Sequence, residues 1–389
     1  MKKIVFITAH NWDTRRQGGF HKFAEATAMA GIETVFFSFP RPYYGLLMRR
    51  EQLNPQIIKT LKKGVGYEVG QGAVLNVTFP TLRLPDAAGR LLPDCLMNFL
   101  LKKSLGSFKS FARKFLADAD CFVFESCEGV AFVDKIRALF PHARIIYRPS
   151  DPLVYASVPE RVRALERHIL YTADLSLIVN QEGVEAYRAS VPDFDQKVAY
   201  KVLSNGIDLD SYKKEYPVPP QLDKPNTVLY VGAWEVEWPL LFEAAERLAD
   251  YSFVVVCPNY PADKVLRQVE RMPNLEYVPG IKPAQVPAWI TNCSVVMVPY
   301  VTDFYKDRPL GITAKYYQAM AAEKPIVVYC DTPKLADVGV TVTYCYEDFI
   351  SAVEKAMSAG SQHYQFDLQG RDWNDICRRF VVLAGGEEE

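Results

Sequence analysis

The 389-residue sequence lacks the short signatures of several common protein classes. Its eight cysteines form no C-x-x-C pair and no metal-ligand spacing, and several lie inside apolar stretches such as "VVVCP" and "IVVYC". This pattern favours buried thiols in a reducing compartment over disulfides or a zinc site. No apolar run reaches the roughly 18 residues of a membrane span, and the apolar part of the first segment covers only residues 4–9. We therefore expect a cytoplasmic protein.

The formal net charge is only −1, but charge is distributed unevenly along the chain. Residues 1–150 hold 22 Lys and Arg against 12 Asp and Glu, whereas the remaining residues hold 23 against 34. Two domains that face different partners would produce this asymmetry. The basic half has no helix-turn-helix, zinc-finger or RRM signature. Nucleic acid is a possible partner of such a basic half, and an anionic membrane surface or a phosphorylated acceptor fits as well. Of these partners we expect the membrane surface and the acceptor, and no nucleic acid.

Short apolar strands alternate with helical stretches over nearly the whole chain. The strand patterns are KIVFITA, ETVFFSF, CFVFES, RIIYR and LSLIVN in the first half, and TVLYVGA, FVVVCP, LEYVPG, SVVMVPY, IVVYC and TVTYCY in the second. Such alternation is typical of parallel, doubly wound α/β sheets. We predict two Rossmann-like domains that face a cleft, joined by the proline-rich connector at 215–226.

The loops that leave the strands are the expected positions of site residues, because ligands of such sheets bind at the carboxyl ends of the strands. The loop "TAHNWDTRRQGGFH" is not G-x-G-x-x-G, which argues against a dehydrogenase. It crowds four basic residues together: His10, Arg15, Arg16 and His21. They form either a solvated basic loop or a contact for an anion or acceptor.

Two carboxylates also follow apolar strands, Glu125 in "FES" and Asp151 in "YRPSDP". The prolines on either side would fix the loop around Asp151. A carboxylate in such a position is a candidate general base, and the alternative is a cap of the following helix. The "DLD" stretch at 208–210 follows "SNGI" and is interpreted as a turn, so no metal site is expected.

The stretch "LGITAKYYQAMAAEKPIVV", residues 310–328, predicts an anion site at the start of a helix. Thr313 can cap that helix, and Lys315 then lies in its first turn, where the helix dipole disfavours a cation. A bound phosphate would remove this penalty, and a lysine that reaches solvent is the alternative. Further residues could converge on the same anion or let the backbone approach it: Gly232, Tyr300, Arg308 and Gln318.

Residues 91–118 combine aromatic and basic side chains at helical spacing. Phe108, Phe111 and Phe115 share one face, and basic residues occupy another. The pattern fits a basic amphipathic helix on an anionic membrane, or a core-facing aromatic stripe with a solvated basic back.

Taken together, these motifs resemble those of GT-B glycosyltransferases, through the "NGID" before the connector and the "K-x-x-Q-A-M-x-x-x-K-P-I-V" that begins at Lys315. They more closely resemble the family of the xanthan-pathway glucuronosyltransferase GumK. The shared stretches occur in order over most of the chain: "AHNWDTRRQGGFHKFAE", "FVFESCEGVAFV", "YRPSDPL", "YVGAW", "VPY" and "AKYYQ".

The resemblance implies an inverting, metal-independent, peripheral membrane enzyme that needs no cofactor. It would transfer a sugar, with glucuronic acid as the best guess, from a UDP-sugar to a polyprenyl-diphosphate-linked oligosaccharide in bacterial exopolysaccharide synthesis. The basic N-terminal domain would face the inner side of the cell membrane. The alternatives are another UDP-hexose as donor, a nucleotide-sugar-binding protein without activity, and a GT-B epimerase or phosphorylase.

The resemblance matches Lys315 and Gln318 to donor contacts and Tyr300 to a donor-pocket tyrosine, and other residues of the loops that leave the strands complete the expected sites. Asp151 matches the catalytic base. The donor-binding set is Gly232, Trp234, Gly280, Tyr300, Arg308, Lys315 and Gln318, and the acceptor-binding set is His10, Asn11, Arg15, Arg16, His21 and Glu125. Three residues depart from the family pattern, which has methionine at Trp234 and Ala314 and an acidic residue at Gly280. The expected acceptor domain is 1–208 plus 370–389, and the expected donor domain is 225–369.

Overall fold

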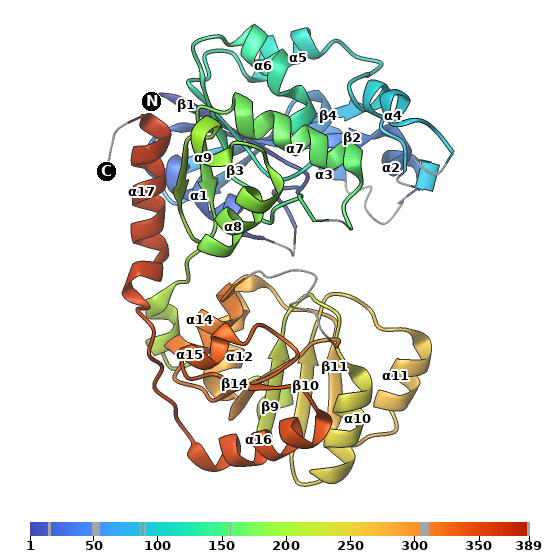
Figure 1. Cartoon of the computed structure of the whole chain (residues 1–389), viewed down its shortest axis with the longest axis vertical. Helices are drawn as coiled ribbons and strands as arrows, with labels where there is room; N and C mark the ends of the chain where they lie inside the picture. The colour runs from blue at the N-terminus through green and yellow to red at the C-terminus, as the bar shows by residue number, and fades with distance from the viewer. Residues whose placement is uncertain are drawn as a thin grey trace. The chain divides into compact units, whose positions relative to one another are not determined.

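A computed structural model describes residues 1–14, 17–48, 55–85, 87–88, 91–155, 157–302 and 311–386. The chain folds into two compact units (Figure 1). Unit 1 comprises Met1–Ser204 and Asp375–Glu389, and unit 2 comprises Asn205–Asn374. Each unit is built on one largely parallel sheet, which confirms the predicted class of two doubly wound α/β domains.

The sheet of unit 1 has the strand order β3-β4-β2-β1-β5-β6-β7-β8. Its strands are β1 (Lys3–Thr8), β2 (Glu33–Pro42), β3 (Val65–Val69), β4 (Gly72–Thr81), β5 (Cys121–Phe124), β6 (Arg144–Tyr147), β7 (Leu175–Ile178) and β8 (Tyr200–Val202). The strand order reverses between β1 and β5, which pair in parallel with Ile7 opposite Phe124. In doubly wound sheets such a reversal marks the ligand-binding edge.

The edge hairpin of β3 and β4 was not predicted. These two strands pair antiparallel, whereas the other pairs in the sheet are parallel. The sequence "VGYEV" of β3 alternates half-buried and exposed side chains instead of forming an apolar run. An edge strand with one solvated face lacks the continuous apolar run of a central strand, and for this reason β3 is not among the predicted strands.

Helices cover both faces of this sheet, which explains why β1 is buried throughout. The helices of unit 1 are α1 (Gly19–Met29), α2 (Tyr43–Met48), α3 (Pro55–Lys62), α4 (Asp94–Leu101), α5 (Phe108–Phe115), α6 (Val133–Leu139), α7 (Glu160–Thr172), α8 (Gln181–Ser190), α9 (Phe194–Lys197) and the C-terminal α17 (Trp373–Gly385). On one face, Phe380 of α17 stacks on Phe23 of α1 with ring centroids 4.4 Å apart. The last helix thereby completes the core of unit 1.

The aromatic stripe of residues 91–118 faces this core. Phe111 and Phe115 are buried, and the Phe111 ring lies 5.0 Å from that of Phe37 and 5.1 Å from that of Phe79. Of the two interpretations, the core-facing stripe therefore describes α5. Lys109 and Arg113 of the same helix remain exposed.

The sheet of unit 2 has the strand order β11-β10-β9-β12-β13-β14 and contains all six predicted strands, paired in parallel. They are β9 (Thr227–Val231), β10 (Ser252–Val256), β11 (Leu275–Val278), β12 (Val295–Pro299), β13 (Ile326–Tyr329) and β14 (Thr341–Thr343). The helices are α10 (Trp238–Arg247), α11 (Asp263–Val269), α12 (Val286–Asn292), α14 (Ala314–Ala321), α15 (Lys334–Asp337) and α16 (Tyr346–Ala359). Here the strand order reverses between β9 and β12.

Two segments at the start and end of unit 2 run side by side. The Ile207 amide donates to the Arg371 carbonyl at 2.8 Å, and the Trp373 amide donates to the Ile207 carbonyl at 3.0 Å.

Across the described ranges, no helix combines the length and the apolar character needed to cross a membrane.

Candidate functional site

Three loops meet at the reversal point of the unit 1 sheet, each leaving the carboxyl end of a strand. Glu125 follows β5 and is only 6% exposed. One of its carboxylate oxygens accepts a hydrogen bond from the Thr8 hydroxyl at the end of β1. The other accepts from the Ser150 hydroxyl in the loop after β6, at 2.7 Å. Both oxygens are thus engaged within the protein, and Glu125 links the three loops.

Asp151 is exposed at the tip of the β6 loop, and the backbone beneath it is fixed. The Ser126 hydroxyl oxygen accepts from the amides of Ser150 and Asp151 at 3.1 and 3.3 Å. The Arg148 guanidinium, buried below the loop, donates to the Pro149 carbonyl at 2.9 Å. Burial lowers the pKa of Arg148 to about 10, and the charges of Glu125 and Asp151 oppose this shift. An exposed carboxylate on a fixed loop is the geometry that a general base requires.

The basic loop after β1 places its histidines in different environments. His21 is 1% exposed, and its ring is hydrogen-bonded to the loop backbone. The Gly18 amide donates to Nδ1 at 3.3 Å, and Nε2 donates to the Asn11 carbonyl at 3.0 Å. Burial lowers the pKa of His21, which favours the neutral ring. Through its two nitrogens the ring links the backbone of Asn11 to that of Gly18. His10 is exposed, with Nε2 3.9 Å from Glu125 Oε1. Arg15 and Arg16 lie outside the described residues.

In unit 2, Lys315 lies in the first turn of α14 and points back onto aromatic rings. Its ammonium donates to the Tyr300 hydroxyl, and Nζ lies 4.4 Å from the Tyr300 ring centroid and 5.7 Å from that of Tyr230. Burial lowers the pKa of Lys315 to about 8, although the Asp331 carboxylate raises it. As a whole the residue is partly exposed, although its ammonium is surrounded by the rings of Tyr230 and Tyr300 and by Asp331.

Two further polar groups lie near the start of α14, and of these Asp331 was not predicted from the sequence. Asp331 lies two residues beyond the end of β13, is buried, and accepts from the Tyr316 hydroxyl and from the Thr332 amide, the latter at 2.6 Å. Burial raises the pKa of Asp331. Thr313 occupies the N-cap position of α14, but its hydroxyl makes no capping bond and is a buried oxygen without a hydrogen-bond partner in the described structure. The α14 start therefore holds an enclosed cation and an unused hydroxyl.

At position 232, directly after β9, glycine leaves space for the side chain of Tyr230. A Cβ at this position would lie 2.4 Å from the Tyr230 hydroxyl oxygen, far inside van der Waals contact. Tyr230 in turn donates to the Trp234 carbonyl at 3.5 Å. Tyr230, which the sequence analysis missed, thus connects Gly232, Trp234 and Lys315.

The remaining donor-set residues lie on separate loops of unit 2. Gly280 follows β11 with φ at +81°, a left-handed conformation that favours glycine. Gln318 lies one turn after Lys315 on α14 and is partly exposed. Arg308 lies outside the described residues. The roles of all these residues remain predictions.

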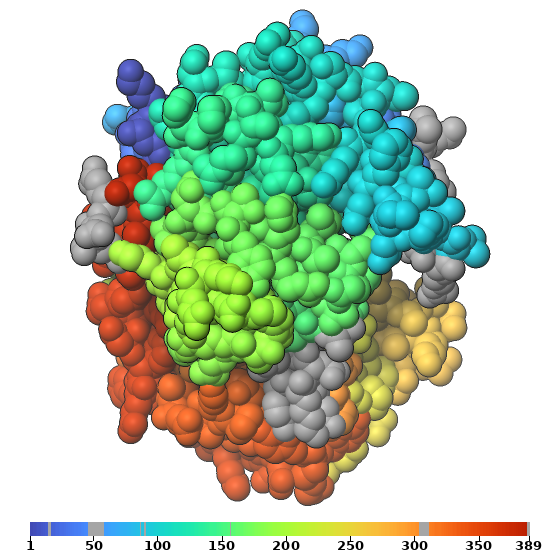
Figure 2. Space-filling view, turned by 45° about the horizontal axis from the view of Figure 1, so that its top comes forward, coloured from blue at the N-terminus to red at the C-terminus, as the bar shows by residue number. Residues whose placement is uncertain are grey.

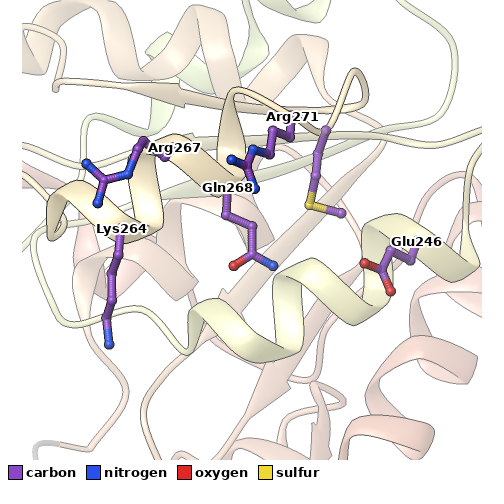
Figure 3. Close-up of a pocket in the computed structure, with 6 residues that line it drawn as sticks. Glu246, Lys264, Arg267, Gln268 and Arg271 are labelled. Atoms are coloured by element: carbon purple, nitrogen blue, oxygen red, sulfur yellow. The ribbon is translucent and has the colours of Figure 1, made fainter.

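Two surface hollows lie away from these loops. One, of about 520 Å³, is lined by Glu246 of α10 and by residues of and after α11, including Lys264, Arg267 and Arg271 (Figure 3). The other, of about 590 Å³, is lined by Met1, Arg137, Arg144 and the last turn of α17 among others. Neither includes a predicted site residue. Where the structure describes the chain, no three His, Cys, Asp or Glu side chains are grouped as metal ligands.

Two family models match the chain. The model described as "Glucuronosyltransferase GumK, N-terminal domain" matches residues 6–179, and the model described as "Glycosyl transferases group 1" matches residues 225–359. A comparison with curated protein sequences gave no match.

Solved structures with a similar fold cover the full length of the chain. Sucrose-phosphate synthase from Thermosynechococcus elongatus is 16% identical with a TM-score of 0.67, over 99% of both chains. The UDP-forming alpha,alpha-trehalose-phosphate synthase from Burkholderia vietnamiensis is 13% identical with a TM-score of 0.65, over 99% of this chain and 100% of that chain. The lipopolysaccharide outer core galactosyltransferase WaaB is 13% identical with a TM-score of 0.56, over 99% of both chains.

The two sheets and these matches define a glycosyltransferase of GT-B type. Within that class the N-terminal half carries the specific similarity, and the chain is a GumK-like GT-B glycosyltransferase.

Proposed function

We propose that the protein is an inverting, metal-independent glycosyltransferase that moves a sugar from a UDP-sugar to a lipid-diphosphate-linked oligosaccharide. The enclosed Lys315 ammonium at the start of α14 is the observation that carries the proposal. A cation in the first turn of a helix is unfavourable, and its burial is more so. An anion bound at the same position would offset both terms.

A nucleotide diphosphate fits this position. Its phosphate oxygens would accept hydrogen bonds from the Lys315 ammonium and from the Thr313 hydroxyl, which otherwise has no partner in the described structure. The trehalose-phosphate synthase with the similar fold is UDP-forming, which supports UDP as the nucleotide. The N-terminal match to a glucuronosyltransferase supports glucuronic acid as the transferred sugar.

Asp151 supplies the base in the proposed reaction. Its carboxylate takes the proton of an acceptor hydroxyl as that oxygen attacks the anomeric carbon. The bond between the anomeric carbon and the UDP oxygen breaks on the opposite face, which inverts the configuration. Negative charge then develops on UDP, where Lys315 and the α14 amides stabilise it without a metal ion.

The acceptor and the location are proposed from the surface of unit 1. Around α4, exposed apolar side chains stand beside lysines: Leu91, Leu96, Phe99 and Leu105 with Lys102 and Lys103. Lys103 lies over the Phe99 ring at 4.8 Å. This segment, coloured cyan, lies on the face shown in Figure 2. Such a surface suits an anionic membrane, so we propose peripheral attachment to the inner face of the cell membrane.

Two alternatives have observations in their favour. Another UDP-hexose is favoured by the departures at Trp234 and Gly280, which occupy donor-pocket positions of the family. A nucleotide-sugar-binding protein without activity is compatible with the same departures, and product formation would exclude it.

The test measures UDP release in EDTA from a panel of UDP-sugars, with a polyprenyl-diphosphate oligosaccharide extract as the acceptor. Asp151→Asn should lower turnover at least 100-fold and leave UDP binding unchanged, because the aspartate contacts the acceptor hydroxyl and not the nucleotide. Asp134→Asn, an exposed aspartate of α6 paired with His168, is the matched control. Near-normal turnover of Asp151→Asn would exclude it as the base.

A further inference from the structure

A buried glutamate in the middle of α7 holds the loop that carries Asp151. Glu166 is 0% exposed. Its Oε2 accepts from the Leu153 amide at 2.8 Å, two residues beyond Asp151. Its Oε1 accepts from the Tyr147 hydroxyl at 2.6 Å and from the Tyr187 hydroxyl at 2.7 Å. The carboxylate thus joins β6, α7 and α8 to one loop amide.

Glu166 satisfies three donors that it holds in the interior, but a fold selected for stability alone would need neither the carboxylate nor the two tyrosine hydroxyls. Burying a carboxylate is unfavourable, and an apolar side chain of similar size would fill an interior helix position without that penalty. Burial raises the pKa of Glu166 to about 7, while the hydrogen bonds from Tyr147, Tyr187 and Leu153 and the charge of Arg167 lower it. A leucine at position 166 could not accept a hydrogen bond from the Leu153 amide.

We propose that Glu166 is a positioning residue for Asp151, acting through the 149–155 loop. The inference rests on the proposed role of Asp151 as the base. Glu125 and Ser126 hold the loop on the amino side of Asp151, through the Ser150 hydroxyl and the amides of residues 150 and 151. Glu166 holds it on the carboxyl side. With both sides fixed, the Asp151 carboxylate has a defined direction at the ligand-binding edge of the sheet.

The hold on the loop depends on the charge of Glu166. A carboxylate is a stronger hydrogen-bond acceptor than a carboxylic acid, so the Leu153 amide is bound more firmly when Glu166 is ionised. The groups that face this carboxyl are the two tyrosines and, at longer range, Arg167. The loop should therefore loosen as pH falls through neutrality.

The experiment compares Glu166→Ala and Glu166→Gln with wild type. Glu160→Gln is the matched control, since Glu160 lies on the same helix but is exposed and pairs with Arg163 and Arg167. UDP release is measured from pH 5.5 to 9 with the panel of UDP-sugars and the polyprenyl-diphosphate oligosaccharide extract that test the proposed function. Hydrogen exchange of the 149–155 amides is measured in parallel.

Glu166→Ala should lower kcat about 10- to 100-fold, as a displaced catalytic group does, with the KM for UDP-glucuronate within twofold. Its loop amides should exchange faster. Glu166→Gln keeps an oxygen for the Leu153 amide, so it should restore kcat to within a few-fold of wild type. In wild type, protonation of Glu166 should lower kcat as pH falls from 8 to 6. Glutamine does not take up a proton in this range, so Glu166→Gln should lack this fall in kcat. Glu160→Gln should match wild type in both measurements.

The outcomes separate this inference from the proposed function. Unchanged kcat and unchanged loop exchange in Glu166→Ala, with Asp151→Asn inactive, would overturn the inference and leave the proposed function intact. If wild type releases no UDP from any donor, the proposed function fails, and the exchange data still decide whether Glu166 holds the loop. If Glu166→Ala does not fold, Glu166→Gln decides: a wild-type pH profile and wild-type loop exchange would refute the inference.

Discussion

Replacing Lys315 with methionine should stabilise the unliganded protein and remove its response to UDP. Methionine keeps most of the aliphatic volume that packs against Tyr230 and Tyr300 and removes the enclosed ammonium. The prediction follows from burial, which lowers the pKa of Lys315 from 10.5 to about 8. At pH 7 the lysine is protonated in the folded state, where its charge is disfavoured relative to the unfolded chain.

The size of the stability change, and its direction with pH, follow from the difference in the pKa of Lys315 between the folded and unfolded chain. A difference of about 2.5 pKa units corresponds to about 3.4 kcal/mol as an upper bound. Lys315 is partly exposed, and screening by solvent reduces the expected gain to about 1–2 kcal/mol. Between pH 8 and 10.5 the unfolded chain binds more protons at this group than the folded chain does, so wild-type stability rises with pH in that window. The advantage of Lys315→Met should therefore be full below pH 8 and shrink toward pH 10.

The assay is thermal unfolding at pH 7 and pH 9.5, with and without UDP, in EDTA. For a domain the size of unit 2, 1–2 kcal/mol corresponds to about 2–8 °C in Tm. UDP at 100 times its Kd should stabilise wild type by about 2.7 kcal/mol and leave Lys315→Met nearly unchanged. Lys355→Met, at an exposed lysine of α16, is the control and should change neither value.

The result that would refute this reasoning is a variant less stable than wild type by the same amount at both pH values. That outcome would mean that the hydrogen bond to Tyr300 outweighs the cost of burial, and the structural reason for an anion at this position would be lost. A UDP-induced shift that survives in Lys315→Met would place the diphosphate elsewhere.

Two further predictions test other parts of the structure. Gly232→Ala should destabilise unit 2 by about 1–3 kcal/mol in a denaturant titration, because its Cβ would lie 2.4 Å from the hydroxyl oxygen and 2.6 Å from Cζ of Tyr230. Tyr230→Phe in the same chain should recover little of the loss, since the ring carbon remains, and full recovery would contradict the clash with the ring. Lys102→Glu with Lys103→Glu should abolish flotation with anionic vesicles at low salt while thermal unfolding stays as in wild type; retained flotation would exclude the α4 surface as the contact.

The sequence was sufficient to predict a strand, a helix or a candidate site residue where one short stretch both forms the secondary-structure element and contains the side chain of interest. All six strands of unit 2 were predicted, and the four central ones, β9, β10, β12 and β13, are buried apolar runs. Lys315 stood out because its helix position contradicts its charge. Glu125 and Asp151 stood out because each lies in the loop that leaves an apolar strand, and hydrogen bonds through Ser126 and Ser150 link the two loops.

The missed features depend on contacts between distant parts of the chain. Asp331 lies in the loop that leaves β13, two residues beyond its end, so the rule that identified Glu125 and Asp151 would have identified it if applied to every strand. Glu166 had no such signal. In sequence it is one more charged residue of an amphipathic helix, and only the packing of α7 against β6 and α8 brings it beside Tyr147 and Tyr187. A helix pattern gives the face of a residue but not the groups that meet that face.

Lys315 and Glu166 have one physical property in common, which links stability to the proposed chemistry. Each is an ionisable group whose charged form is disfavoured by burial, with the pKa moved toward neutrality from opposite sides. A protein selected for stability alone would replace both with apolar residues, as buried charges are weak contributors to folding. Each has polar partners arranged around it instead, and each adjoins a predicted site residue or is one itself. Perturbed groups of this kind concentrate at functional sites. If Lys315→Met stabilises the protein and removes its response to UDP, and if Glu166→Ala impairs turnover and speeds exchange of the loop amides, the two positions are retained for the reaction and not for the fold.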